Sequence, residues 1–357
     1  MAEATHDIEI RDLYKIFGRN GAAHVADVKA GMTKEELKAK HNHVLGLDDI
    51  NLTIPAGRIQ VVMGLSGSGK STLIRHINRL IDPTSGQVIF EDRDIVQMSQ
   101  SELRDFRRRK TAMVFQKFAL FPHRTVLENT TYGLAVRGVK AKEAEERARR
   151  WITRVGLDGF EESYPNQLSG GMQQRVGLAR ALTNDAEILL MDEAFSALDP
   201  LIRTDMQSVL LDLQQELRKT IVFITHDLDE ALRLGDQIAI LRDGRIIQQG
   251  TGEQIVLRPA DDYISNFVHD VRRGHVITVG TITRKGKHAE TPVTLPAATL
   301  LEEAARAMTQ SEVNRANVTD EGGNHLGVVT LSKCVAEMIA PDTASDATEA
   351  PPEAMSA

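Results

Sequence analysis

The sequence predicts an α/β protein with a parallel-sheet core, followed by a small C-terminal α+β module. Strand-like apolar runs alternate with helix-like stretches from Ile188 to Ile247, which is the layout of a parallel sheet with crossover helices. Earlier in the chain, the apolar run Ile59–Met63 leads into a glycine-rich loop and then into a helix-compatible stretch. A different, shorter pattern begins after about residue 270, which indicates a second module.

Composition narrows the class of protein. The chain has 357 residues, a formal net charge of −7 and a single cysteine, Cys334, so no disulfide can form within it. The acidic balance argues against a nucleic-acid-binding protein, whose domain would be basic. No run approaches about 18 apolar residues, and Met1–Ile8 does not have the pattern of a signal peptide. We therefore expect a soluble cytosolic protein.

The glycine-rich loop, Gly64–Ser71, fits the G-x-x-x-x-G-K-[ST] pattern of a phosphate-binding loop. A flexible Gly/Ser loop is the alternative, but the flanking strand and helix favour the phosphate site, because free backbone N–H groups and the helix dipole then face an anion. Lys70 can reach the β- and γ-phosphates, and the Ser71 hydroxyl can ligate Mg²⁺. We expect the phosphates of ATP to contact Gly64, Ser66, Gly67, Gly69, Lys70, Ser71 and Thr72.

Two further strand ends carry polar side chains. Asp192 ends the apolar run Ile188–Asp192, where an unpaired carboxylate would be costly, so we expect Mg²⁺ as its partner. Glu193 follows directly. His226 follows the apolar run Thr220–Thr225. A lone histidine after a strand is more often structural, but the two motifs upstream favour a functional one.

The sequence Leu168–Gln173 reads LSGGMQ and lies between these motifs. With it, the first three quarters of the chain resemble the ABC-type ATPases. The resemblance implies that Glu193 polarises the attacking water, and that His226 contacts the γ-phosphate and holds Glu193 and the water. It also makes Gln116 the glutamine that senses Mg²⁺ and the membrane partner, and hence a further Mg²⁺ ligand.

The resemblance extends to nucleotide contacts and to assembly. Phe17 would stack on adenine, although it can equally be a core residue. Ser169, Gly170 and Gly171 open a helix and form a second anion site. In ABC proteins this site, with the region of Asp199, completes the ATP pocket of the opposite subunit. Because the chain has one copy of each motif, the resemblance implies a homodimer that encloses two ATP molecules.

The ATPase domain is expected over residues 1–265, with a mostly helical, charged stretch from Ser99 to Arg180 and a helical subdomain at about 97–180. The polar stretch Gly18–His43 separates two predicted strands, Ile8–Phe17 and Leu45–Ile54, and is therefore interpreted as an insertion. Thr33 and Glu36 within it fit a capping box.

Residues 275–340 resemble a single CBS motif. An amphipathic helix is predicted at Thr299–Met308 and short strands at Ala316–Val318 and Gly327–Thr330. Lys333 stands where CBS nucleotide sites usually have an acidic residue, which argues against adenine-nucleotide binding here. We expect a regulatory module, followed by a disordered tail over residues 341–357.

The closest family resemblance is to the ATP-binding subunits of importers for glycine betaine, choline or proline betaine. Four features carry it: the opening strand, the insertion, the run from Met191 to Arg203, and the CBS-like module. It implies ATP hydrolysis coupled to quaternary-amine uptake, a separate permease, an extracytoplasmic solute-binding protein, and a peripheral position on the cytoplasmic face of the cell membrane. Phe118–Gly133 resembles the surface that receives the permease, although a local packing cluster is the alternative.

Other functions stay open on the sequence alone. Related systems for histidine or proline use very similar ATPase subunits. An exporter is disfavoured by the CBS-like module and by the absence of a fused membrane domain. A soluble ABC ATPase that acts on nucleic acid is disfavoured by the acidic composition and by the absence of a long coiled coil or a second cassette.

Overall fold

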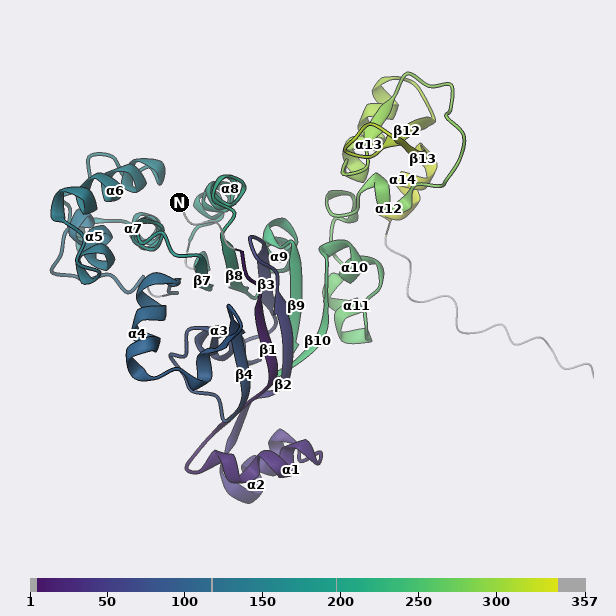
Figure 1. Ribbon diagram of the computed structural model, residues 1–357. Helices are drawn as coiled ribbons and strands as arrows, with labels where there is room; N and C mark the ends of the chain where they lie inside the picture. The colour runs from purple at the N-terminus through teal and green to yellow at the C-terminus, as the bar shows by residue number, and fades with distance from the viewer. Residues whose placement is uncertain (1–4, 117, 197, 340–357) are drawn as a thin grey trace, which may run out of the picture. The chain divides into compact units, whose positions relative to one another are not determined.

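The computed structural model describes residues 5–116, 118–196 and 198–339. It divides into two compact units, Met1–Gly252 and Glu253–Ala357 (Figure 1). The expected disordered tail at 341–357 lies outside the described residues, as does Ala197 in the loop before Asp199. Among the described residues, the structure contains no helix with the length and apolarity needed to traverse a membrane.

The first unit is built around a six-stranded sheet in the order β10-β9-β3-β8-β7-β6. Five neighbouring strands are parallel, and β10 alone runs antiparallel to β9. Every residue of β3, β7 and β8 is buried, as expected for strands covered on both faces. The strands are β3 (Ile59–Met63), β6 (Thr111–Val114), β7 (Ile188–Asp192), β8 (Thr220–Thr225), β9 (Gln237–Arg242) and β10 (Arg245–Gly250).

A second, antiparallel sheet packs against this core in the order β2-β1-β4-β5. Its strands are β1 (Ile8–Phe17), β2 (Val44–Ile54), β4 (Ser85–Phe90) and β5 (Arg93–Asp94). Apolar residues of both sheets and of helix α3 (Lys70–Ile77) form one buried cluster, with Ile8, Val62 and Leu73 among them. The helix that follows the phosphate loop is therefore anchored in the main core.

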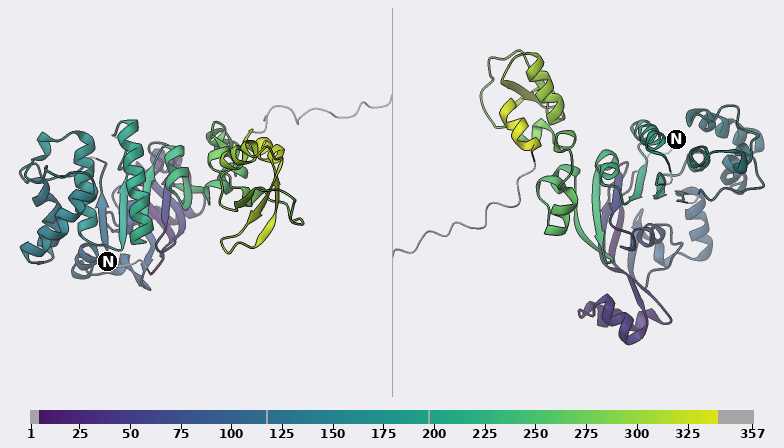
Figure 2. Two further views of the ribbon diagram at one scale, coloured as in Figure 1. Left: turned by 90° about the horizontal axis from the view of Figure 1, so that it is seen from above. Right: turned by 180° about the vertical axis from the view of Figure 1, so that it is seen from behind.

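The predicted insertion is confirmed between β1 and β2. It contains a 3-10 turn, η1 (Gly21–His24), and two short helices, α1 (Val25–Lys29) and α2 (Lys34–His41), which project beyond the sheets in Figure 1 and in the right-hand view of Figure 2. Thr33 and Glu36 form the expected capping box at the start of α2. A small core of its own includes Val28 and Leu37.

The stretch from Ser99 to Arg180 is not helical throughout, because β6 lies within it and pairs with β7. The strand β6 lies between a charged helix and a loop. Its four residues are too few to show the two-residue alternation by which a strand is recognised in a sequence. The helices here are α4 (Gln100–Arg109), α5 (Val126–Val136), α6 (Ala141–Arg154) and α7 (Gly170–Thr183), with 3-10 turns at η2 (Ile95–Gln97) and η3 (Pro165–Gln167). In Figures 1 and 2, α5, α6 and α7 lie together at one end of this unit. Helix α8 (Pro200–Leu217) follows β7, and helix α9 (Leu228–Leu234) follows β8.

The second unit contains a three-stranded sheet in the order β11-β12-β13. The chain order β11, α13, β12, β13, α14 contains the helix and the two strands predicted for a CBS-like module. The strands are β11 (Thr294–Pro296), β12 (Arg315–Thr319) and β13 (His325–Thr330). The helices are α10 (Gly252–Leu257), α11 (Asp262–Val268), η4 (Arg273–His275), α12 (Val279–Ile282), α13 (Leu301–Gln310) and α14 (Leu331–Met338).

Candidate nucleotide-binding site

The carboxyl ends of β3, β6, β7 and β8 lie at one edge of the parallel sheet and place the predicted residues there. The phosphate loop starts at Gly64, which has φ +149°, and a Cβ at this position would lie 2.1 Å from the carbonyl oxygen of Leu241. Only glycine fits there without a shift of the backbone. The loop therefore depends on close contact with β9.

The Lys70 side chain, at the end of the phosphate loop, donates hydrogen bonds back to the start of the loop. Its ammonium donates to the carbonyl oxygens of Gly64, at 2.8 Å, and Leu65, at 3.0 Å, and lies 3.8 Å from a carboxylate oxygen of Glu193. Burial lowers the pKa of Lys70, and the nearby carboxylates of Glu193 and Asp192 oppose this effect. The Lys70 ammonium is thus held next to the position that an anion bound by the loop would take.

Asp192 has two partners within this site. The Ser71 hydroxyl donates to Oδ1 at 2.7 Å, and the Arg75 guanidinium lies 3.1 Å from Oδ2. The buried carboxylate therefore has protein partners as well as the Mg²⁺ that the sequence predicts for it. Arg75 was missed because nothing in the sequence shows which face of α3 turns toward β7.

Glu193 is surrounded by the residues predicted to act with it. The Gln116 amide donates to Oε2 at 2.9 Å, and Nδ1 of His226 lies 3.7 Å from the same oxygen. Glu193 has φ 45°, an uncommon conformation for a non-glycine residue, and its backbone N–H donates to Ile224 at 3.2 Å. The turn after β7 thus aims the carboxylate at the phosphate loop.

A pocket of about 400 Å³ is lined in part by the phosphate loop. Phe17 forms part of its wall, and its ring packs over Gly46, where a Cβ would lie 2.6 Å from the ring. The predicted residues that line the pocket are Phe17, Ser66, Gly67, Gly69, Lys70, Ser71, Thr72, Gln116 and Glu193. Lys34, Val44, Leu45 and Gly46 were not predicted to line it.

Seven predicted residues do not line this pocket. Gly64, Asp192 and His226 lie at the strand ends described above, whereas the other four lie at the starts of α7 and α8. Ser169 caps α7 by accepting a hydrogen bond from the Met172 N–H at 3.3 Å, and Gly170 and Gly171 form the first turn. Asp199 caps α8 by accepting from the Ile202 N–H at 3.0 Å. Within one chain, the second anion site is therefore separate from the phosphate loop.

Comparison with known proteins identifies the family. Residues 47–196 match the model of the ABC transporter family, and residues 287–340 match the model of the CBS domain. The chain is 54% identical over 280 residues to the glycine betaine transport ATP-binding protein OpuAA of Bacillus subtilis (strain 168), which covers 78% of this chain and 67% of that protein. The chain belongs to the ABC transporter ATP-binding proteins.

Two further matches extend this ABC assignment. The glycine betaine/proline betaine transport system ATP-binding protein ProV of Salmonella typhimurium (strain LT2) is 46% identical over 334 residues, 93% of this chain and 82% of that protein. The dimeric ATP-binding cassette MJ0796 bound to ADP and phosphate has a TM-score of 0.59 and 32% identity, over 69% of this chain and 98% of that one. The predicted fold class, an ABC ATPase with a CBS domain, is confirmed, and the chain is an ATPase of this type.

Proposed function

We propose that this chain hydrolyses ATP to drive the import of a quaternary amine such as glycine betaine or choline. The 54% identity with a glycine betaine transport ATP-binding protein supports the substrate class. The geometry around Glu193 supports the reaction, because it gathers the charged and polar groups that phosphoryl transfer to water requires.

The residues around Asp192 fit a Mg²⁺ ion. Ser71 and Asp192 are already joined by a hydrogen bond, and Gln116 lies at the same edge, so hydroxyl, carboxylate and amide oxygens can all serve as ligands. Mg²⁺ would neutralise charge on the β- and γ-phosphates. These oxygen donors suit a hard cation and offer no thiolate or imidazole ligand.

The reaction assigns a role to each neighbour of Glu193. Glu193 orients and polarises the water, while Gln116 and His226 hold the Glu193 carboxylate in place. Lys70 and the loop amides bind the phosphates, and Phe17 stacks on adenine. Catalysis in this scheme is mostly positioning and electrostatic stabilisation.

The complete ATP site is proposed to need two chains. Ser169, Gly170 and Gly171 present helix N–H groups that a phosphate can accept, yet they do not line their own chain's pocket. A head-to-tail homodimer would place them, together with Asp199, against the partner's ATP. The dimeric cassette similar to this chain supports such an assembly.

A groove on the same unit is suited to a membrane permease. It has a volume of about 420 Å³ and is lined by apolar residues such as Phe121, Tyr132 and Val136. Arg180 on α7 also lines it and donates to the carbonyl oxygens of Ala119, at 2.7 Å, and Phe118, at 3.1 Å. A permease helix in this groove would thus be linked to α7, which begins within the LSGGMQ sequence.

The rest of the transport system follows from the same proposal. The chain would lie peripherally on the cytoplasmic face of the cell membrane, with a separate permease and an extracytoplasmic solute-binding protein. It would not act on nucleic acid, given its net charge of −7. The CBS-like module would regulate the ATPase.

Uptake of labelled glycine betaine, choline, histidine and proline, in cells with and without this chain, tests the proposal. We expect loss of betaine or choline uptake alone, restored by the wild-type chain and not by Glu193→Gln. Loss of histidine or proline uptake instead would overturn the substrate class. Unchanged uptake of all four solutes would overturn the assignment to import of these solutes.

A further inference from the structure

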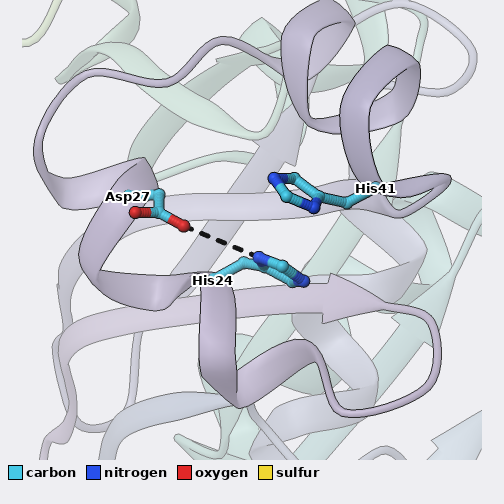
Figure 3. Close-up of side chains that lie close together, drawn as sticks. All are labelled: His24, Asp27 and His41. Atoms are coloured by element: carbon cyan, nitrogen blue, oxygen red, sulfur yellow. Dashed lines mark ion pairs between the residues drawn. The ribbon is translucent and has the colours of Figure 1, made fainter.

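The insertion between β1 and β2 brings together two histidines and an aspartate that the nucleotide site does not use. His24 ends η1, Asp27 lies in α1, and His41 ends α2. One potential ligand atom from each lies within 4.8 Å of the others. Figure 3 shows the His41 ring over the His24 ring, with the Asp27 carboxylate facing both.

We propose that His24, Asp27 and His41 bind a zinc ion. Two imidazole nitrogens and one carboxylate oxygen are a ligand set of zinc sites that keep one position open for water. Nδ1 of His24 and Oδ2 of Asp27 are 3.6 Å apart. This is longer than a hydrogen bond but close to the separation of about 3.4 Å between two ligands of a tetrahedral ion bound at about 2.1 Å.

The remaining contacts of the two rings leave nitrogen atoms available to an ion. The centroids of His24 and His41 are 4.1 Å apart. In the described part of the chain, neither ring nitrogen of His41 has a hydrogen-bond partner. Nearby His43 cannot be a fourth ligand in this arrangement, because its ring nitrogens lie 2.7 and 2.8 Å from the carbonyl oxygens of His41 and Arg19.

A second cluster in the same unit provides a contrast. His6, Glu91 and Glu187 are equally close together, but the Lys110 ammonium lies 2.7 Å from Glu91 and 2.6 Å from Glu187. Burial alone would lower the pKa of Lys110, but hydrogen bonds to the two glutamates outweigh it and raise the pKa. A fixed ammonium therefore takes the place that a cation would need.

Zinc would tie α1 to α2 in a segment with little core of its own. The buried cluster beneath these helices contains five residues, three of which belong to β1 and β2. Small elements with so few buried side chains are stabilised strongly by a metal. The ion would thus act mainly as a structural clamp on the insertion.

The clamp would also reach the nucleotide pocket. Lys34, the first residue of α2, lines that pocket, and its ammonium lies 3.4 Å from Asp243. At the other end of the insertion, the His43 ring lies against Gly18, next to Phe17. Zinc would therefore fix two segments that border the proposed adenine site.

The test is a Zn²⁺ titration of the full chain after treatment with a chelator, in competition with a chromogenic zinc chelator. We expect one tightly bound Zn²⁺ per chain. The variant with His24→Ala and His41→Ala should bind at least about 100-fold more weakly, because loss of mere supporting residues already costs 10–100-fold. Co²⁺ at the wild-type site should show the visible absorption of a tetrahedral nitrogen–oxygen complex.

His6→Ala is the matched control, because it removes a histidine from the cluster that Lys110 occupies, and zinc binding should not change. Circular dichroism checks the fold of the double variant. If its helical signal falls, Asp27→Asn replaces it, since this exposed change keeps the size of the side chain. Two results would overturn the proposal. One is equal zinc binding by the wild type and by whichever ligand variant keeps the native helical signal. The other is a wild-type chain that loses its Zn²⁺ to the chelator.

Discussion

Replacing His76 with leucine should make the first unit more resistant to acid. His76 lies on α3, directly after the phosphate loop, and is fully buried. Its Nδ1 donates to the carbonyl oxygen of Thr72 at 2.6 Å, while its Nε2 is buried without a partner among the described residues. Burial lowers the pKa of His76 from 6.5 to about 4, so the neutral ring is the form that the folded protein prefers.

The size of the effect follows from this pKa difference. The unfolded chain takes up a proton near pH 6.5, whereas the folded chain does so only near pH 4. Between these values the unfolded state binds more protons, so the free energy of unfolding falls as the pH falls. At about 1.36 kcal/mol per pKa unit, His76 removes about 2 kcal/mol of stability by pH 5 and about 3 kcal/mol by pH 4.

Leucine has no proton to bind and is close to histidine in size. It loses the hydrogen bond to Thr72, whose carbonyl oxygen already accepts within the helix, and it removes the unpartnered Nε2. Stability at pH 7 should therefore change by no more than about 1.5 kcal/mol, the size of one hydrogen bond. The difference between His76→Leu and wild type should then grow toward pH 4.

Urea unfolding at a series of pH values measures this difference. Trp151 is the only tryptophan in the sequence and is buried in α6, so its fluorescence reports on the first unit. His123→Leu, which changes an exposed histidine, is the control and should follow the wild type. If His76→Leu and wild type lose stability in parallel from pH 7 to pH 4, the folded protein accommodates a charged His76 and the reasoning fails.

Four further predictions concern other parts of the chain. Glu193→Gln should bind ATP and accumulate as a dimer in light scattering, with hydrolysis slowed at least about 100-fold; near-normal hydrolysis would remove Glu193 from its role. Gly18→Ala should lower the free energy of unfolding by about 1–3 kcal/mol, because φ is +141° and the new Cβ would lie 2.3 Å from the His43 ring; an unchanged urea midpoint would contradict this. Burial raises the pKa of Cys334 to about 11, so a thiol reagent at pH 8 should label the native protein slowly and the urea-unfolded protein quickly; rapid native labelling would show that the thiol is accessible. Deletion of residues 275–357 should keep ATP hydrolysis but change its response to salt, and the same salt profile with and without these residues would argue against regulation by the module.

The phosphate loop and the strand ends could be predicted because local rules decide them. Glycines in a fixed pattern, a lysine and a hydroxyl follow one apolar run. Asp192 ends a later apolar run, and His226 directly follows another. Since parallel strands share one carboxyl edge, the sequence already implies that these side chains meet. Gln116 and the role of Glu193, by contrast, were assigned through the resemblance to ABC ATPases.

The role of Lys34 in the pocket wall could not be predicted in this way. It lies in the insertion, which the sequence shows only as a polar stretch with one capped helix. Its position depends on how α2 packs against β2 through a few apolar residues far apart in the chain. The proposed zinc ligands His24 and His41 were missed for the same reason, because His41 lies 17 positions after His24 and no metal-binding spacing connects them.

For Asp192, the physical reason behind the predicted Mg²⁺ contact was incomplete. The sequence suggested Mg²⁺ because an unpartnered buried carboxylate would be costly, yet Ser71 and Arg75 each hold one of its oxygens. The proposed Mg²⁺ does not require both contacts to break. The Ser71 oxygen, which donates to Oδ1, keeps lone pairs that can face an ion, while the half-exposed Arg75 can stay on Oδ2. Arg75 and Ser71 therefore stabilise the buried charge together. The proposed metal site depends on the pairing of Ser71 with Asp192 rather than on an uncompensated carboxylate.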